Sequence, residues 1–372
     1  MAEIPPYPLY NRSYLLYRLS PLHTPDASLL TPSSLKTHAQ RLTSQLKGDS
    51  LRNFDLGINV DPEGSTLASL GPLEHCSWDS LGDEDAWITQ HRHLVDADTS
   101  LVSTQQGTQI RGVQVTLDYE KTSYNALLLC DPDHITSPPS FTSLPLLMLK
   151  MPAPIREIFL NYLATAFDTR HAPLDLSSSF LTSTLETYLR RLTTPNSPQT
   201  VKSIVNEVSL QLSFDSPSLS HIDVTLAADD IPKFLDRGKH INPDTPFTAA
   251  LSLYLKSHMA LDVSHPGVNI SRLSCAAFNL GNDRIRFSVP EATEISMMSS
   301  SETENSDLSP AQLAFQDVYA ALVREAAGKG MFLTTGEDAR GTGSSTPSAE
   351  AAGGARRGMA RRGRPRSVAR GT

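Results

Sequence analysis

Cysteine is scarce in this sequence, and no long hydrophobic run occurs in it. Only three cysteines stand among 372 residues, which excludes a disulfide-stapled scaffold and a cysteine-rich metal cluster and is typical of a reducing compartment. No apolar run approaches the roughly 18 residues that a membrane-spanning helix needs. The first ten residues lack the basic and apolar regions of a secretory signal, so we expect neither export nor a membrane.

The motifs of nucleotide and acyl-transfer enzymes are also missing. No glycine-rich turn leads into Lys-Ser or Lys-Thr, so a phosphate-binding P-loop is excluded. No G-x-G-x-x-G follows a strand-like segment, and no G-x-S-x-G presents a nucleophilic serine. The sequence therefore predicts no cofactor and no small-molecule substrate.

Metal and catalytic patterns are weak. His91 and His93 form an H-x-H pair in a polar stretch, without C-x-x-C or H-x-x-x-H nearby, which favours a solvated pair over a metal site. Glu74-His75-Cys76 with Asp79 has the residue types of a Cys/His/Asp site, but neighbours on an extended chain point to opposite faces. We expect Cys76, like Cys130 and Cys275, to be a buried structural thiol.

Two acidic clusters have the residue types of a catalytic site but also a simpler structural explanation. Asp83-Glu84-Asp85 and Asp229-Asp230 are carboxylate groups of the kind that hydrolases use, but surface turns and first helical turns carry them too. We therefore expect no enzyme, and an enzyme with a site built from dispersed acidic and histidine residues stays the least favoured alternative.

Charge is distributed unevenly along the chain. The net charge is −8, yet residues 351–372 hold seven arginines and no acidic residue. Residues 1–350 thus carry −15 once the +7 of this tail is set aside. An arginine tail on an acidic body favours a polyanionic partner.

Hydrophobic periodicity predicts strands and helices in the first half. Apolar alternation indicates strands at 9–19, 51–60 and in a hairpin over 113–130, and a continuous apolar run at 144–151 indicates a central buried strand. Helical spacing predicts helices at 33–47, around Trp87, and at 154–167 and 177–192, the first ending before Gly48.

The second half is richer in strand patterns. Alternation predicts strands over 201–214, 219–226 and 268–280, the last paired with 284–289 through a turn at 281–283. A helix is expected at 246–258, and another at 310–326 with Ser309 as its cap and Pro310 in its first turn.

These patterns divide the chain into five parts. They are an N-terminal α+β region at 7–192, a β-rich region at 201–290, an acidic Ser-rich linker at 291–308, a C-terminal helix at 309–327 and a disordered Arg/Gly-rich tail at 328–372.

The tail contains one specific motif. Arg362-Gly363-Arg364-Pro365-Arg366 reads R-G-R-P-R, the core of an AT-hook. Glycine and proline keep such a backbone narrow and extended, so the arginines can lie in the narrow, strongly negative minor groove of A·T tracts. DNA contact, a nuclear import signal and general attraction to polyanions all remain open, and all three point to the nucleus.

Several longer segments resemble one family. YNRSYLLYRLSPL (10–22), GPLEHCSWDSLGDEDAW (71–87) and LPLLMLKMPAPIREIFLNYLATAFDTRHAPL (144–174) are similar to the centromere protein L (CENP-L) family of filamentous fungi. FDSPSLSHIDVTLAADDIPKFL (214–235) and HPGVNISRLSCAAFNLG (265–281) fit the same family. The resemblance covers about 7–290 and leaves out the tail.

The resemblance implies a fold and a role. The fold is α+β, with curved, largely antiparallel β-sheets backed by helices. The role is that of a non-enzymatic inner-kinetochore subunit in the constitutive centromere-associated network, which pairs with a CENP-N-like subunit and assembles on centromeric chromatin for chromosome segregation. A protein that binds AT-rich DNA or chromatin through its tail alone is the alternative.

The resemblance also suggests binding residues. Family members pair through their C-terminal sheet, which maps to about 201–289, and an edge strand is the physical route to such pairing. We expect the strand 268–280 and its hairpin mate to supply it, through Val268, Ile270, Leu273, Ile285 and Phe287. The family complex presents basic residues to DNA, for which composition offers Lys233, Arg237, Lys239, Arg284 and Arg286.

Overall fold

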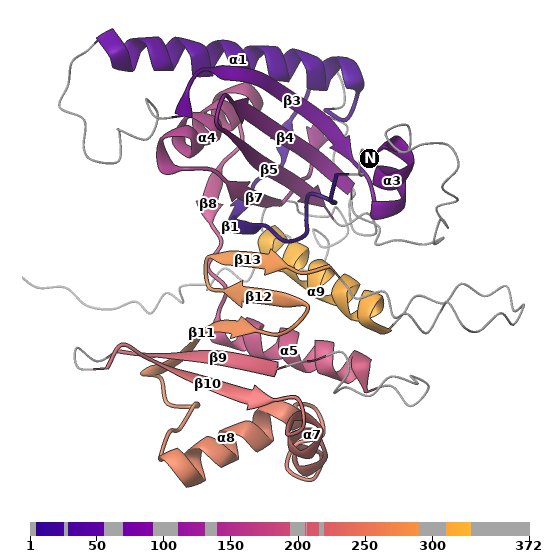
Figure 1. Cartoon of the computed structure of the whole chain (residues 1–372), viewed down its shortest axis with the longest axis vertical. Helices are drawn as coiled ribbons and strands as arrows, with labels where there is room; N and C mark the ends of the chain where they lie inside the picture. Colours follow the sequence, from indigo (N-terminus) through magenta and orange to yellow (C-terminus); the bar gives the residue numbers. More distant parts are fainter. Residues whose placement is uncertain are drawn as a thin grey trace, which may run out of the picture. The chain divides into compact units, whose positions relative to one another are not determined.

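The structure of the chain is a computed structural model (Figure 1). It describes residues 5–25, 29–55, 70–91, 111–130, 140–193, 205, 207–215, 219–289 and 310–328. All of these belong to one compact unit, Met1–Leu333. No helix among them is long and apolar enough to cross a membrane.

Most of the described strands belong to one large antiparallel sheet. Its strands run in the order β10-β9-β11-β12-β13-β1-β7-β5-β4-β3, with β8 paired to β1, and these neighbouring strands pair in antiparallel fashion. The strands are β1 (Ser13–Leu19), β3 (Leu73–Leu81), β4 (Arg111–Tyr119), β5 (Thr122–Cys130), β7 (Leu146–Lys150), β8 (His171–Pro173), β9 (Glu207–Phe214), β10 (His221–Ala227), β11 (Val268–Ser274), β12 (Phe278–Gly281) and β13 (Arg284–Phe287). A separate small sheet joins β2 (Leu22–His23) to β6 (Phe141–Thr142).

Helices cover parts of both faces of this sheet. They are α1 (Pro32–Asp55), α3 (Glu84–His91), α4 (Ala153–Phe167), α5 (Ser178–Leu192), α7 (Ile231–Lys239), α8 (Pro246–Met259) and α9 (Pro310–Ala327). The α+β class expected from the resemblance, with a largely antiparallel sheet backed by helices, is confirmed. The tail lies outside the described residues.

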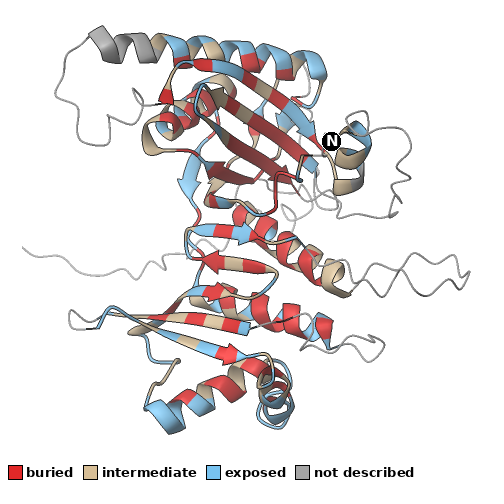
Figure 2. Ribbon diagram, viewed as in Figure 1, coloured by how far each residue is buried: buried red, intermediate tan, exposed pale blue. Residues whose placement is uncertain are grey.

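Two hydrophobic cores lie on opposite faces of the sheet. On one face, α1 and α4 pack on the strands of the first half of the chain, with Trp78 and Phe159 in this core. On the other face, α5, α8 and α9 pack on β9, β11, β13 and β1, with Tyr188 and Phe315 in that core. Strand β7 contributes to both cores through alternate residues, so its continuous apolar run is explained by burial on two faces (Figure 2).

The first and second halves of the chain share the sheet. β1 pairs with β13 through Tyr14 and Ile285, and with β7 on its other side. The backbone N–H of Leu174 donates to the carbonyl oxygen of Leu16 at 3.0 Å, and α5 follows directly. Strands from 7–192 and from 201–290 therefore form one hydrogen-bonded structure.

Most predicted helices and strands are confirmed. The hairpin of β4 and β5 turns at Glu120–Lys121 as expected, and α4, α5, α8 and α9 begin and end within two residues of the predicted bounds. Ser177 caps α5 by accepting from the backbone N–H of Phe180 at 3.2 Å. Proline in the first turn of α4, α8 and α9 fits its fixed φ and missing N–H.

Three predictions about secondary structure were wrong. Helix α1 continues past Gly48 to Asp55, so 51–55 is helical rather than a strand, and 56–60 lies outside the described residues. The spacing of Leu51 and Phe54 suits a helix as well as a strand, and this ambiguity misled the prediction. The sequence predicted no strand at 73–81, which forms β3, and no helix at 231–239, which forms α7.

Candidate partner-binding site

The residues expected to bind a partner lie inside the sheet. β11 pairs with β9 on one side and with β12 on the other, so it has no free edge. The run 268–280 is two strands, because the chain reverses between Ser274 and Phe278. The expectation of an open edge at 268–280 was therefore wrong. Alternating hydrophobicity marks one buried face of a strand and does not reveal whether its backbone already has two neighbours.

Four of these five side chains are in the core. Ile270, Leu273, Ile285 and Phe287 are each at most 4% exposed, and they pack in the core that α5 and α9 cover. Val268, at the start of β11, is half-buried. The four buried side chains pack against other residues of this chain.

The five candidate DNA-contacting cations lie on two elements. Lys233, Arg237 and Lys239 belong to α7, and Arg284 and Arg286 to β13. Three of them form short-range ion pairs on the surface, namely Lys233 with Asp230, Lys239 with Asp236 and Arg284 with Asp283. The motif Arg362–Arg366 lies outside the described residues.

The cysteine and histidine motif does not assemble. Cys76 is buried and packs in the core with α1, whereas His75 is exposed. Burial raises the pKa of the Cys76 thiol to about 11, so the nucleophilic thiolate is scarce at neutral pH. Cys275 is half-buried against the other core, and desolvation raises the pKa of its thiol to about 12. No cluster of three or more metal-ligating side chains occurs among the described residues.

The acidic clusters serve as helix and surface groups. The Asp83 carboxylate accepts the backbone N–H of Ala86 at 2.8 Å in the first turn of α3, and Asp230 accepts from Lys233 at 2.8 Å. His91 bonds through Nδ1 to the Trp87 carbonyl oxygen at 2.9 Å, and its ring stacks on the indole at 4.1 Å. Asp83, Asp230 and His91 thus have structural partners, and His93 lies outside the described residues.

The sheet ends at two strands among the described residues, β10 and β3. β3 has a bulge between Leu73 and His75, and Glu74, His75 and Asp79 project from it, exposed. Bulges and charged side chains are devices that keep an edge from pairing. β10 pairs with β9 in unbroken register from His221 to Ala227, so it is the more regular template.

The register identifies the backbone groups that β10 leaves open. The backbone N–H of Phe214 donates to the carbonyl oxygen of Ser220 at 3.1 Å, and these groups alternate sides along an antiparallel strand. Ile222, Val224 and Leu226 therefore direct their N–H and C=O groups toward β9. The outward groups are those of His221, Asp223 and Thr225, whose side chains are all exposed. The carbonyl oxygen of Ala227 already accepts from the backbone N–H of Asp230 at 3.0 Å.

A groove follows this open edge. It has a volume of about 470 Å³. One wall is formed by residues 223–226 of β10, and the other by α7 and α8 through Phe234, Tyr254 and Met259. Figure 1 shows both helices beside β10 at this end of the sheet. Outward backbone groups of β10 and apolar side chains thus border the same cleft, together with the charged side chains of Asp223, Asp230, Lys233 and Arg237.

Two features fix the helical wall. A side chain at Gly238 would meet the Pro246 carbonyl oxygen at 1.7 Å, so only glycine permits this approach of α7 to the start of α8. Phe234 and Tyr254 meet edge to face, with ring centroids 5.5 Å apart. The groove is therefore bounded by packed elements.

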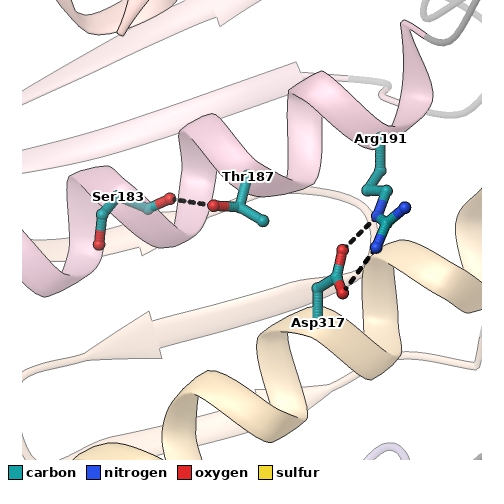
Figure 3. Close-up of polar contacts among 4 residues, drawn as sticks. All are labelled: Ser183, Thr187, Arg191 and Asp317. Atoms are coloured by element: carbon teal, nitrogen blue, oxygen red, sulfur yellow. Dashed lines mark hydrogen bonds and ion pairs between the residues drawn. The ribbon is translucent and has the colours of Figure 1, made fainter. Parts of the chain in front are cut away.

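A second cleft lies between α5 and α9. It has a volume of about 710 Å³, and Arg190, Arg191 and Arg324 are among its lining residues. Arg191 donates from Nε to Oδ2 of Asp317 at 2.5 Å and from Nη2 to Oδ1 at 3.2 Å, and so joins the two helices (Figure 3). The Thr187 hydroxyl donates to the carbonyl oxygen of Ser183 on its own helix at 2.9 Å. The Arg191–Asp317 ion pair therefore joins α9 to α5, whereas the Thr187 bond lies within α5.

Comparison with protein families agrees with this architecture. The family model described as Centromere protein L matches residues 8–327, a range that includes every strand and helix from β1 to α9. The chain belongs to the centromere protein L family. Membership in CENP-L gives the protein a role at the centromere and kinetochore, in the nucleus. No curated protein matches the chain.

The sequence did not reveal the edge and groove of this CENP-L chain. Alternation predicted β10 itself, but the free edge depends on the order of strands in the sheet. The helix α7 was missed because its nine residues are polar on one side and include Pro232 and Gly238. The one available signal was the spacing of Ile231, Phe234 and Leu235.

Proposed function

We propose that this protein is a non-enzymatic structural subunit of the inner kinetochore that pairs with a CENP-N-like subunit along the open edge of β10. The pairing helps to assemble the kinetochore on centromeric chromatin for chromosome segregation. The single observation that carries this proposal is the outer edge of β10, with which no other described strand pairs, beside a groove lined by both apolar and charged side chains. Family membership supports an inner-kinetochore assembly role.

The physical basis of the pairing is strand addition. A partner strand along β10 satisfies the outward N–H and C=O groups of His221, Asp223 and Thr225, and gains main-chain hydrogen bonds for itself. Of the five parts proposed from the sequence, the β-rich region 201–290 contains this edge. The linker 291–308 and the tail 328–372 precede and follow the C-terminal helix in the sequence. β10 thus replaces 268–280 as the proposed pairing strand.

A proline substitution tests the edge. Thr225→Pro removes an N–H that points away from β9, so the ladder between β9 and β10 keeps its bonds while an added strand loses one and meets the ring. Thr225→Ala is the matched control, because it keeps the N–H. Binding to the purified CENP-N-like subunit, followed by light scattering on a sizing column, is expected to weaken at least tenfold for T225P and less than about threefold for T225A.

Two outcomes would overturn the pairing. Equal binding by T225P and wild type would mean that the edge is not used. Self-association of the wild-type chain that T225P abolishes, with no binding to the CENP-N-like subunit, would assign the edge to a second copy. Thermal melting of both variants controls for folding.

We also infer a contact of the tail with A·T-rich DNA, because R-G-R-P-R at 362–366 lies in a segment of seven arginines. Replacing Arg362, Arg364 and Arg366 by alanine removes the motif, and replacing Arg356, Arg357 and Arg370 removes the same charge outside it. Fluorescence anisotropy on A·T and G·C duplexes should show that only the first set removes a preference for A·T. Equal losses from both sets would indicate general electrostatic attraction.

A further inference from the structure

The groove beside β10 has a chemistry that restricts the partner strand. We propose that it selects a strand with large apolar side chains at alternate positions, those opposite Val224 and Leu226, and polar side chains at the positions between them. This inference rests on the edge pairing proposed above and names the kind of strand that fits it.

The period of a β-strand supplies the first step. Side chains directly opposite one another on paired strands lie on the same face of the sheet. Val224 and Leu226 belong to the face that packs on the core of α5 and α8. A residue added opposite either of them projects to that face, where α7 and α8 form the far wall of the groove.

The far wall supplies the second step. Met259 is 47% exposed and Tyr254 is 39% exposed, although both are large apolar side chains that line the groove. Figure 2 shows exposed residues along the outer part of α8 beside β10. Exposed apolar side chains gathered at one cleft mark a binding surface, and a volume of about 470 Å³ lies within the usual range of ligand clefts.

The opposite face supplies the third step. His221, Asp223 and Thr225 have exposed side chains on the face away from this core, and Asp223 accepts from Gln211 of β9 at 3.0 Å. A partner side chain opposite these positions is therefore next to polar groups and water. The two faces together require alternation in the partner, with its apolar half in the groove.

The same residues of β10 form the open edge and one wall of the groove, and this identifies what binds in the groove. Residues 223–226 form both the open backbone edge and one side of the groove, so a strand that pairs with β10 also enters the groove. We therefore assign the groove to the pairing strand of the CENP-N-like subunit. Burying one aromatic side chain in such a pocket is the arrangement that dominates interface energetics.

Two substitutions on one helix test this assignment. Met259→Glu places a charge in the groove. Leu253→Glu is the matched control, because Leu253 is 51% exposed on α8 but does not line the groove. By surface plasmon resonance with the purified CENP-N-like subunit, M259E is expected to raise Kd at least tenfold and L253E less than about threefold. Met259→Leu should restore binding to within about threefold of wild type.

The outcomes separate this inference from the proposed function. If T225P blocks pairing but M259E binds like wild type, the edge is used and the groove inference is wrong. If L253E weakens binding as much as M259E does, the groove is not the selective feature and the inference is again wrong. If wild type does not bind the CENP-N-like subunit, the proposed function fails first.

Discussion

Glu186 caps the first turn of a helix that begins 60 residues later in the sequence. The backbone N–H of Thr248, in the first turn of α8, donates to Glu186 Oε1 at 2.5 Å. Glu186 lies on α5 and is only 3% exposed. The cap residue Thr245 makes no side-chain capping bond of its own, so α5 supplies the acceptor and fixes α8, one wall of the partner groove.

Removing this acceptor should destabilise the protein. Glu186→Ala leaves a buried N–H without a partner and removes a negative group from a helix N-terminus, and we expect the free energy of unfolding to fall by about 2 kcal/mol. Glu186→Gln keeps an oxygen acceptor and should cost less. Urea denaturation measures both, with the exposed Thr187→Ala on the same helix as control. No difference between E186A and T187A would contradict the capping role.

Ile285 should behave as a core residue and not as a contact with the partner. Its side chain is 1% exposed in the core under α9, so Ile285→Ala should lower the free energy of unfolding by about 2–4 kcal/mol. The half-buried Val268→Ala should cost much less. Chemical denaturation of the isolated chain decides this point, and the prediction is wrong if I285A weakens partner binding while leaving stability unchanged.

The thiols of Cys76 and Cys275 should react slowly in the folded protein. Their pKa values are raised to about 11 and about 12 by burial, so at pH 8 both are almost wholly protonated. With Ellman's reagent we expect both to react at least tenfold more slowly than in urea, where all three cysteines are accessible. Mass spectrometry assigns the labelled sites. Fast native labelling of Cys76 would contradict its position in the core.

His38 should make stability depend on pH. Its ring Nδ1 lies 2.8 Å from the Tyr162 hydroxyl, which donates to the His38 carbonyl oxygen at 3.2 Å. Burial, and then the charge of Arg41, lower the pKa of His38. The unfolded chain, with a pKa near 6.5, therefore binds more protons than the folded one, and stability falls as the pH drops from about 7.5 through 6.5.

A variant isolates this contribution. His38→Asn keeps an N–H donor near Tyr162 but does not titrate, so the decrease in unfolding free energy between pH 7.5 and 5.5 should be smaller than in wild type. The exposed His171→Asn is the control, and its profile should follow wild type. The same pH slope in H38N and wild type would show that other groups cause the decrease.

Local sequence patterns correctly predicted the helices and strands that place their apolar side chains on one face. The stripes of α4 and α5 each bury one face, and the alternating Val113, Val115 and Leu117 of β4 lie in one core, so a period of 3.6 or 2 was enough. Prediction failed where two periods coincide. Leu51 and Phe54 suit either structure, and helix α1 takes them because it has already formed ahead of Gly48.

The partner site shows the limit of the same reasoning. Apolar alternation in 268–274 predicts a strand with one buried face, and β11 is such a strand. Whether its backbone edges are free depends on β9 and β12, which come from residues before 215 and after 277. Nothing local to Ile270 or Leu273 records those neighbours, so the sequence placed the edge on the wrong strand.

The sequence by itself determined the α+β class, the buried central strand at 146–150, the main helices and the resemblance to the CENP-L family, because these depend on periodicity, caps and similarity of long segments. Only the tertiary structure decided that β10 carries the open edge, that α7 and α8 border it, and that Glu186 caps α8. These are contacts between residues far apart along the chain. Their formation depends on the order of strands in the sheet, which the period of any one strand does not encode.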